Sequence, residues 1–323
     1  MNWRTLLGLL MACLIVIAGS GCSSKGADSS EKSKEQKKPL HIVTTFYPMY
    51  EFTKNIAKNK AQVDLLIPAN VEPHEWEPSP KDMAAIQKAD ILVYNSSYME
   101  TWISSLQKSL GKDGPIFLEA SKGISLMEGV EEDEHEHGDD AEHHEKEGEH
   151  GLDPHVWLSP VLAQHEVQMI TEELIKQDPQ NKVDYEKNSQ AYIQKLKDLD
   201  QLYRKTLQNT ASKEIITQHA AFGYLAKQYG LIQVPIAGLS PEEEPSPSKL
   251  AELKNFAKKH HIKVIYFEET TSPKVAQTLA DELGAKTEVL NTLEGLSKED
   301  QEKGLDYIEV MENNLKSLAN SLK

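Results

Sequence analysis

Apolar and polar positions follow two rhythms along residues 40–323: short β-branched runs, and longer segments with apolar residues at helical spacing. The short runs predict strands at residues 40–46, 62–67, 90–95, 115–118, 214–218, 231–236, 263–267 and 286–290. The longer segments predict helices at residues 48–58, 81–88, 99–110, 161–176, 222–229, 248–260 (with Ser248 as a plausible cap) and 273–283, and a final helix from about residue 299. Strands that alternate with helices indicate parallel βαβ units.

One segment predicts a helix much longer than the others. Tyr185, Tyr192, Leu196, Leu199, Tyr203 and Leu207 recur at steps of three, four and seven residues, after a helix start at Asp178 and Pro179. We therefore expect an α/β protein of two lobes, each a roughly four-stranded parallel sheet flanked by helices, joined by one long backbone helix. The expected bounds are 40–177 for the N-terminal lobe, 178–210 for the linker helix and 211–323 for the C-terminal lobe.

The N-terminus predicts export. A positive start precedes an apolar run at residues 6–17, which is shorter than the ~20 residues that span a bilayer and fits a signal peptide at 1–21. Small residues followed by Cys22 resemble the bacterial lipobox, which implies cleavage before Cys22 and lipidation of its thiol. An ordinary cleaved signal with an incidental cysteine is the alternative. Residues 22–39 are polar and predict a disordered, lipid-anchored tether.

The cysteine content and the net charge argue against a disulfide-bonded protein and against a nucleic-acid-binding protein. The other cysteine, Cys13, lies in the apolar run, so the processed chain would contain no disulfide. The net charge is −16, and no basic, aromatic-rich patch is present, which argues against nucleic acid as a partner. Residues 131–150 contain five histidines and eleven acidic residues. We expect a disordered loop at 128–151. It would either form a second, low-affinity metal site at His135, His137, His143, His144 and His150, or act as a solvated spacer.

Four other residues predict a metal site. His74, His155, His219 and Glu294 each follow a predicted strand, two in each half of the chain. Ligands of parallel sheets bind at the carboxyl ends of the strands, so these four would meet between the lobes. Three imidazoles and a carboxylate suit Zn²⁺ better than Mn²⁺.

Some assignments around this site stay open. Glu268, or water, is an alternative to Glu294 as the fourth ligand. Asp153 is a candidate to orient a neighbouring ligand. His41, His165, His260 and His261 lie in or beside predicted elements, and we interpret them as structural.

The order of motifs resembles the metal-specific solute-binding proteins of bacterial ABC importers, cluster A-I, in its zinc branch (ZnuA/AdcA-type). The matching motifs are FYP at 46–48, PHEWEPS at 73–79, DPHVWLSP at 153–160, HAAFGY at 219–224 and LEGL at 293–296. This resemblance implies an extracytoplasmic lipoprotein that binds Zn²⁺ through His74, His155, His219 and Glu294. It also implies delivery of the ion to an ABC permease driven by an ATPase subunit. The family's manganese branch replaces the third histidine by a carboxylate, so His219 argues for zinc.

Rival functions make different demands on the sequence. A manganese-specific protein of the same family, and a surface adhesin or metal buffer, are the alternatives to zinc delivery. A zinc hydrolase needs an open metal position and a general base. The chain has no HExxH motif, and a fourth protein ligand would close the site. We therefore expect no enzymatic activity, and we expect a monomer.

Overall fold

The computed structural model describes residues 38–68, 70–129, 151–242 and 245–323. All helices and strands below lie within Pro39–Lys323, which forms one compact unit. The predicted signal peptide, nearly all of the tether with Cys22, and the five loop histidines lie outside the described residues. Among the described helices, none has the length and apolar character needed to cross a membrane.

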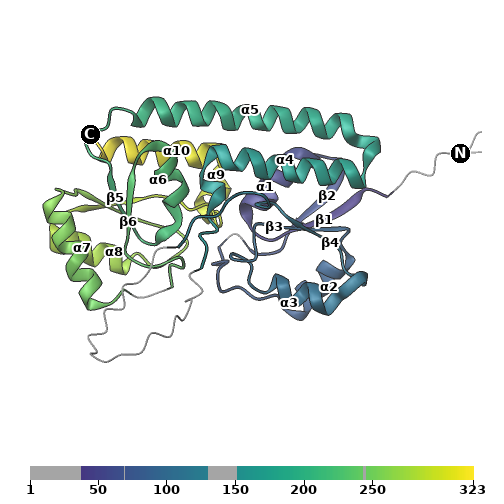
Figure 1. The fold of residues 1–323 in the computed structure, drawn as a ribbon, viewed down its shortest axis with the longest axis horizontal. Helices are drawn as coiled ribbons and strands as arrows, with labels where there is room; N and C mark the ends of the chain where they lie inside the picture. The colour runs from purple at the N-terminus through teal and green to yellow at the C-terminus, as the bar shows by residue number, and fades with distance from the viewer. Residues whose placement is uncertain (1–37, 69, 130–150, 243–244) are drawn as a thin grey trace, which may run out of the picture. The chain divides into compact units, whose positions relative to one another are not determined.

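The N-terminal lobe contains a parallel sheet in the order β2-β1-β3-β4 (Figure 1). Its strands are β1 (Leu40–Thr44), β2 (Ala61–Leu65), β3 (Ile91–Tyr94) and β4 (Ile116–Glu119). Alternate residues of β1 and β3 point to opposite faces. Ile42 and Ile91 pack in one buried cluster with helices α1 (Tyr47–Ala57) and α4 (Pro160–Gln177), whereas Val43 and Leu92 pack with α2 (Pro80–Lys88) and α3 (Ile103–Leu110). Both faces are covered, as parallel sheets require.

The C-terminal lobe repeats this topology. Strands β5 (Glu214–Thr217), β6 (Ile232–Pro235), β7 (Val264–Phe267) and β8 (Lys286–Val289) are parallel and ordered β6-β5-β7-β8. The helices are α6 (Gly223–Tyr229), α7 (Pro247–Lys259), α8 (Lys274–Leu283), α9 (Lys298–Lys303) and α10 (Tyr307–Ser321). The prediction of two lobes with four-stranded parallel sheets is confirmed.

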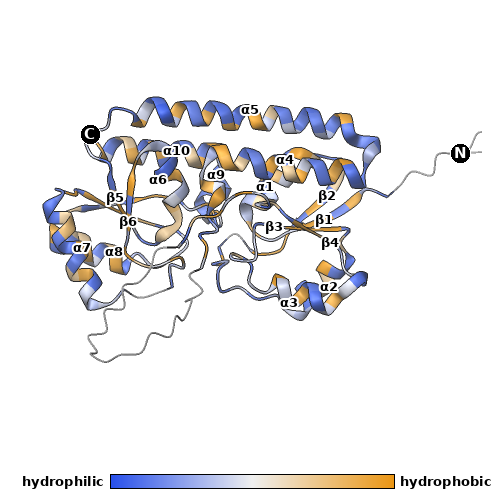
Figure 2. Cartoon of the chain, in the orientation of Figure 1, coloured by the Kyte–Doolittle hydropathy of each residue, from blue (hydrophilic) through white to orange (hydrophobic). Residues whose placement is uncertain are grey.

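The long helix is α5 (Lys182–Leu207), with 26 residues. It contacts α1 and α4 of the first lobe and α10 of the second, and it lies along α4 and α10 in Figure 1. Figure 2 shows its apolar residues along one side, as the sequence spacing predicts. The helix is shorter than predicted, because a 3₁₀ turn at Pro179–Asn181 precedes it and Asp178 accepts hydrogen bonds from Asn181 and Tyr185.

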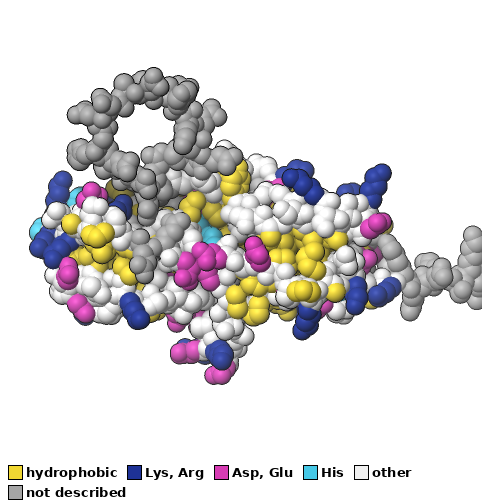
Figure 3. Space-filling view, turned by 90° about the horizontal axis from the view of Figure 1, so that it is seen from below, with side chains coloured by type: hydrophobic (Ala, Val, Ile, Leu, Met, Phe, Trp, Pro, Cys, Tyr) yellow, Lys and Arg dark blue, Asp and Glu magenta, His cyan; other side chains and the backbone are white. Residues whose placement is uncertain are grey.

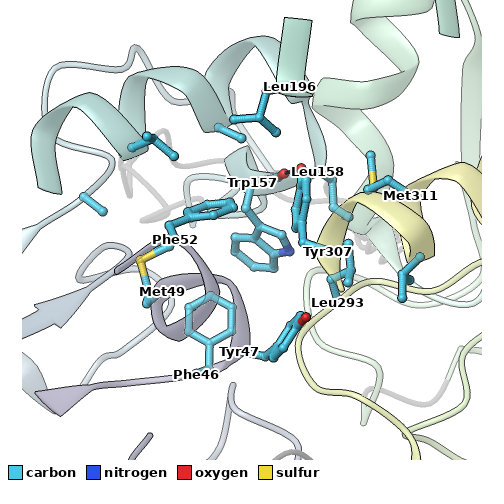
Figure 4. Close-up of a cluster of buried hydrophobic side chains, with 14 of the residues drawn as sticks. Phe46, Tyr47, Met49, Phe52, Trp157, Leu158, Leu196, Leu293, Tyr307 and Met311 are labelled. Atoms are coloured by element: carbon cyan, nitrogen blue, oxygen red, sulfur yellow. Dashed lines mark hydrogen bonds between the residues drawn. The ribbon is translucent and has the colours of Figure 1, made fainter. Parts of the chain in front are cut away.

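One apolar cluster runs through both lobes and places the segment after His155. Trp157 and Phe46 are fully buried, with ring centroids 4.8 Å apart, and Phe52 packs on Tyr307 at 5.1 Å. Figure 4 shows these side chains between α1 of the first lobe and α10 of the second. Because Trp157 comes from the first lobe and Tyr307 from the second, burying them ties the lobes together.

Three local predictions were wrong. The final helix is divided into α9 and α10, because Gly304 adopts φ +69°, a left-handed conformation that ends α9. Helix α7 is capped by the hydroxyl of Ser246 rather than Ser248, since Pro247 occupies its first turn. Helix α3 begins at Ile103, although its apolar pattern begins at Met99.

Candidate metal centre

The four predicted ligands lie in loops at the carboxyl ends of the strands. His74 is in the proline-rich loop between β2 and α2, and His155 immediately precedes a 3₁₀ turn at Val156–Leu158 that leads into α4. His219 follows β5, and Glu294 follows β8. Each lobe therefore contributes two side chains, and the arrangement of the two parallel sheets brings all four to one place.

Their donor atoms form a compact group. One donor atom from each side chain lies within 4.8 Å of the other three. Nε2 of His155 is 3.2 Å from Nε2 of His74 and 3.3 Å from Nε2 of His219. Oε1 of Glu294 is 3.3 Å from Nε2 of His74, 3.3 Å from that of His155 and 3.4 Å from that of His219. Donors about 2.0–2.1 Å from a tetrahedral ion are separated by about 3.3 Å, so these five separations suit tetrahedral zinc. The sixth separation, between His74 and His219, lies within the 4.8 Å limit of the group.

Two further carboxylates orient the histidines. Oδ1 of Asp153 accepts a hydrogen bond from Nδ1 of His155 at 2.8 Å, and Oε1 of Glu268 accepts one from Nδ1 of His219 at 2.5 Å. A neutral imidazole with its proton on Nδ1 has a lone pair on Nε2. These lone pairs point at the same space, so a proton or a metal cation must lie among them. Glu268 thus contacts His219 from outside the group, in the position where metal sites place an orienting carboxylate.

The charges of the site are strongly coupled. Burial acts to lower the pKa of His219, but Glu268 and Glu294 outweigh it and hold that pKa well above its usual range. Burial acts to raise the pKa of Glu294, but His219 and the other imidazoles hold it well below its usual range. Burial lowers the pKa of His74, and the hydrogen bond with Glu294 offsets this only in part. The site therefore contains an ionised carboxylate that favours a cation.

Sequence reasoning missed two residues at the site. Oε1 of Glu72 accepts a hydrogen bond from the backbone N–H of His74 at 3.0 Å, and burial together with nearby Glu294 raises the pKa of Glu72 to about 8. The hydroxyl of Thr292 donates to Oε2 of Glu294 at 3.1 Å. Glu72 lies two residues before a predicted ligand, which was a usable signal. Nothing in the sequence marks Thr292, because its role depends on the fold of the loop.

The other described histidines lie outside the group. His41 contacts Asp64, His165 contacts the carbonyl oxygen of Lys122, and His260 contacts Glu214. His261 is exposed just after α7. Figure 3 shows a small histidine surface near the middle of one face of the molecule, with acidic side chains close by.

Two parallel α/β lobes with a His₃Glu group between them define a binding protein whose site could hold a metal ion. The chain belongs to the ZnuA family, whose model is described as zinc-uptake complex component A periplasmic and matches residues 42–321. This confirms the predicted resemblance. It also places the chain in a family of solute-binding proteins, a class that is not enzymatic.

Known proteins resemble the chain over nearly its full length. It is 62% identical over 322 residues to the high-affinity zinc uptake system protein ZnuA of Bacillus subtilis (strain 168), which covers 99% of this chain and 98% of that protein. The crystal structure of the metal-dependent lipoprotein YcdH from B. subtilis is 63% identical and has a TM-score of 0.74, covering 88% of this chain and 99% of that one. The Zn(II)-bound ZnuA-like domain of Streptococcus pneumoniae AdcA is 47% identical, with a TM-score of 0.74 and the same coverage.

Proposed function

We propose that this protein binds Zn²⁺ with high affinity through His74, His155, His219 and Glu294 and delivers it for uptake. The observation that carries this proposal is that five of the donor separations among three imidazoles and one carboxylate are 3.2–3.4 Å. A relative with 62% identity is named as a high-affinity zinc uptake protein, and a neighbouring structure is Zn(II)-bound. A nanomolar site would correspond to roughly −12 kcal/mol of binding free energy.

Zinc is favoured over manganese by the donor set. Mn²⁺ prefers oxygen donors and higher coordination numbers, whereas Zn²⁺ accepts four-coordinate sites rich in imidazole. His219 occupies the position where the family's manganese branch is expected to have a carboxylate. Its Nδ1 is held by Glu268, which increases the basicity of the ligating nitrogen. Four protein donors would also leave no position for a reacting water, which is consistent with transport rather than catalysis.

Membership of the family supports a proposal for the partner and the location. We propose that the protein acts outside the cytoplasm, as a monomer, after removal of residues 1–21 and lipidation of Cys22. The globule would then be attached to the outer face of the cell membrane by residues 22–39. It would pass zinc to an ABC permease driven by an ATPase subunit. A relative described as a metal-dependent lipoprotein supports the anchor.

The histidine-rich segment is a proposed second site of low affinity. Two backbone hydrogen bonds pair the chain on either side of this segment, and we call the paired residues 127–129 and 151–153 its stem. Gly129 N–H donates to Gly151 O at 2.9 Å, and Asp153 N–H donates to Met127 O at 2.8 Å. Asp153 in turn orients His155. We propose that residues 128–151 form a loop of the lobe 40–177 that concentrates Zn²⁺ near the main site. We also propose 178–210 as the bounds of the linker helix and 211–323 as those of the second lobe.

Metal content and competition measurements test the function. Mass spectrometry of the purified chain should find one tightly held zinc, and competitive titration should show Zn²⁺ preferred to Mn²⁺. His219→Ala should strongly reduce the affinity for Zn²⁺ and the preference for Zn²⁺ over Mn²⁺. His165 lies outside the group, so His165→Ala should change neither property. Tight zinc binding that survives His219→Ala unchanged would contradict the proposed site.

A further inference from the structure

The two oxygens of Glu294 have different neighbours. Oε1 faces the Nε2 atoms of the three histidines at 3.3–3.4 Å. Oε2 instead accepts a hydrogen bond from the Thr292 hydroxyl at 3.1 Å. Thr292 and Glu294 are each 2% exposed, so bulk water does not compete for this bond. The Thr292 hydroxyl therefore engages Oε2 in a hydrogen bond. Without this bond, Oε2 could become a fifth donor to a bound ion.

Thr292 is held in place by the segment that carries His155. The indole Nε1 of Trp157 donates to the carbonyl oxygen of Thr292 at 2.8 Å. The carbonyl oxygen of Trp157 accepts a hydrogen bond from the Tyr307 hydroxyl at 2.5 Å. Figure 4 shows Trp157 and Tyr307 side by side in the apolar cluster. Thr292 is thus held by Trp157, which lies two residues after His155 and is itself bonded to Tyr307 of the second lobe.

The backbone on either side of Thr292 is also constrained. The side-chain amide of Asn314 bonds both the N–H and the carbonyl oxygen of Asn291, at 2.8 and 2.7 Å. The Asn291 side chain accepts the N–H of Leu293 at 2.7 Å, and Leu293 adopts φ +59°. A left-handed conformation is unusual for a residue other than glycine and persists only where its surroundings enforce it. The loop therefore presents Thr292 and Glu294 in one defined arrangement.

We propose that Thr292 determines metal specificity by keeping Glu294 monodentate, so that the bound ion has four ligands. This inference rests on the proposed zinc site. Four-coordinate geometry suits Zn²⁺, whereas Mn²⁺ prefers more oxygen donors. If the Thr292 hydroxyl were absent, Oε2 could turn toward the ion and supply a fifth donor. The hydroxyl would thus lower the affinity for Mn²⁺ relative to Zn²⁺ without contacting the ion.

The test compares Thr292→Val, which has nearly the same shape but no hydroxyl, with Thr292→Ser, which retains the hydroxyl. Competitive titration with Zn²⁺ and Mn²⁺ alone should show the ratio of zinc to manganese affinity falling about tenfold in Thr292→Val, as expected for loss of a hydrogen bond to a charged group. The Co²⁺-loaded variant should lose the strong visible absorption of tetrahedral cobalt. Thr292→Ser should keep both properties.

Matched controls decide the outcome. Thr171→Val removes another buried hydroxyl, in α4 and outside the metal group, and should leave the ratio unchanged. A ratio within about twofold of wild type in Thr292→Val, or the same fall in Thr292→Ser or Thr171→Val, would overturn the inference. Should Thr292→Val not fold, X-ray absorption of the zinc-loaded wild type decides, since a bidentate Glu294 overturns it. Failure of the wild type to bind zinc would overturn the proposed function itself.

Discussion

Single side chains next to the His₃Glu group orient the proposed histidine ligands within it. Asp153 and Glu268 each accept a hydrogen bond from the outer nitrogen of a histidine, and both carboxylates are buried. Such contacts fix the tautomer and ring orientation of the ligand. Asp153 lies two residues before His155, so the sequence offered it as a candidate for this role. Glu268 lies in a different strand–helix loop from His219, so spacing gave no signal for its contact. The sequence offered Glu268 as an alternative fourth ligand because it too follows a predicted strand, and the structure places it on Nδ1 of His219.

Removing either orienting carboxylate should weaken zinc binding. We expect Asp153→Ala and Glu268→Ala each to reduce zinc affinity by about 10- to 100-fold, because the imidazole loses its fixed tautomer and part of its basicity. Competitive titration against a chelator measures this. Glu214→Ala is a matched control, since Glu214 lies at the start of β5, contacts His260 and is not one of the four grouped residues. An affinity unchanged in both variants would show that the carboxylates do not support the ligands.

Zinc affinity should fall as the pH falls. The raised pKa of His219 means that the metal-free site holds a proton at neutral pH, which zinc must displace. Apparent affinity therefore rises with pH until the pH passes that raised pKa, and decreases by up to about tenfold per pH unit below it for each proton displaced. The decrease should steepen in acid as His74, whose pKa is lowered, also binds a proton. Titrations from about pH 5 to about pH 8 measure the slope, and a flat profile would contradict the histidine-rich site.

At the scale of helices and strands, the sequence predicts periodic features well and interruptions poorly. All eight strands were predicted within two residues at most ends, because buried parallel strands are short β-branched runs. The division of α9 from α10 was missed, since Gly304 ends a helix only when it adopts its left-handed conformation there. The convergence of the ligand loops depends on the strand order, which the sequence did not predict. It was expected only because ligands of parallel sheets bind at the carboxyl ends of the strands.

Packing of the buried side of α5 should contribute measurably to the free energy of unfolding. Leu196 is fully buried in the cluster shared by α1, α4 and α10, so Leu196→Ala should lower the free energy of unfolding by about 2–5 kcal/mol. Urea denaturation should show a lower midpoint with an unchanged m-value. Val183→Ala, at a position in the same helix that is 76% exposed, should change stability little. Equal losses in both variants would mean that α5 is not stabilised by its buried side.

The whole molecule combines one enclosed metal group with one acidic, histidine-rich segment joined to it by a short stem. The main-chain bond between Gly129 and Gly151 closes this stem, so residues 130–150 can be replaced by a two-residue Asn-Gly turn. We expect this deletion to leave one tightly bound zinc and to remove weaker zinc ions. Isothermal titration measures both classes of site.

The deletion has a matched control of full length. Replacing His135, His137, His143, His144 and His150 by asparagine keeps the charge and length of the segment but removes its imidazoles. The weak ions should disappear in this variant as well. If either variant loses the tight site, the segment is not an auxiliary antenna, and the assignment of the four main ligands must be revised.

If the four side chains bind the ion as proposed, their unequal exposure would set the order of events in metal exchange. The His74 side chain is 9% exposed, whereas those of His155, His219 and Glu294 are 0–1% exposed in the part of the chain that the structure describes. Solvent can therefore attack the coordination sphere first at the bond to His74. An arriving ion would meet the other three donors already assembled and would lose its last water when the His74 loop closes on it. Release of the ion would follow the opposite order. The lifetime of the bound state would then depend on how often the His74 imidazole dissociates from the ion.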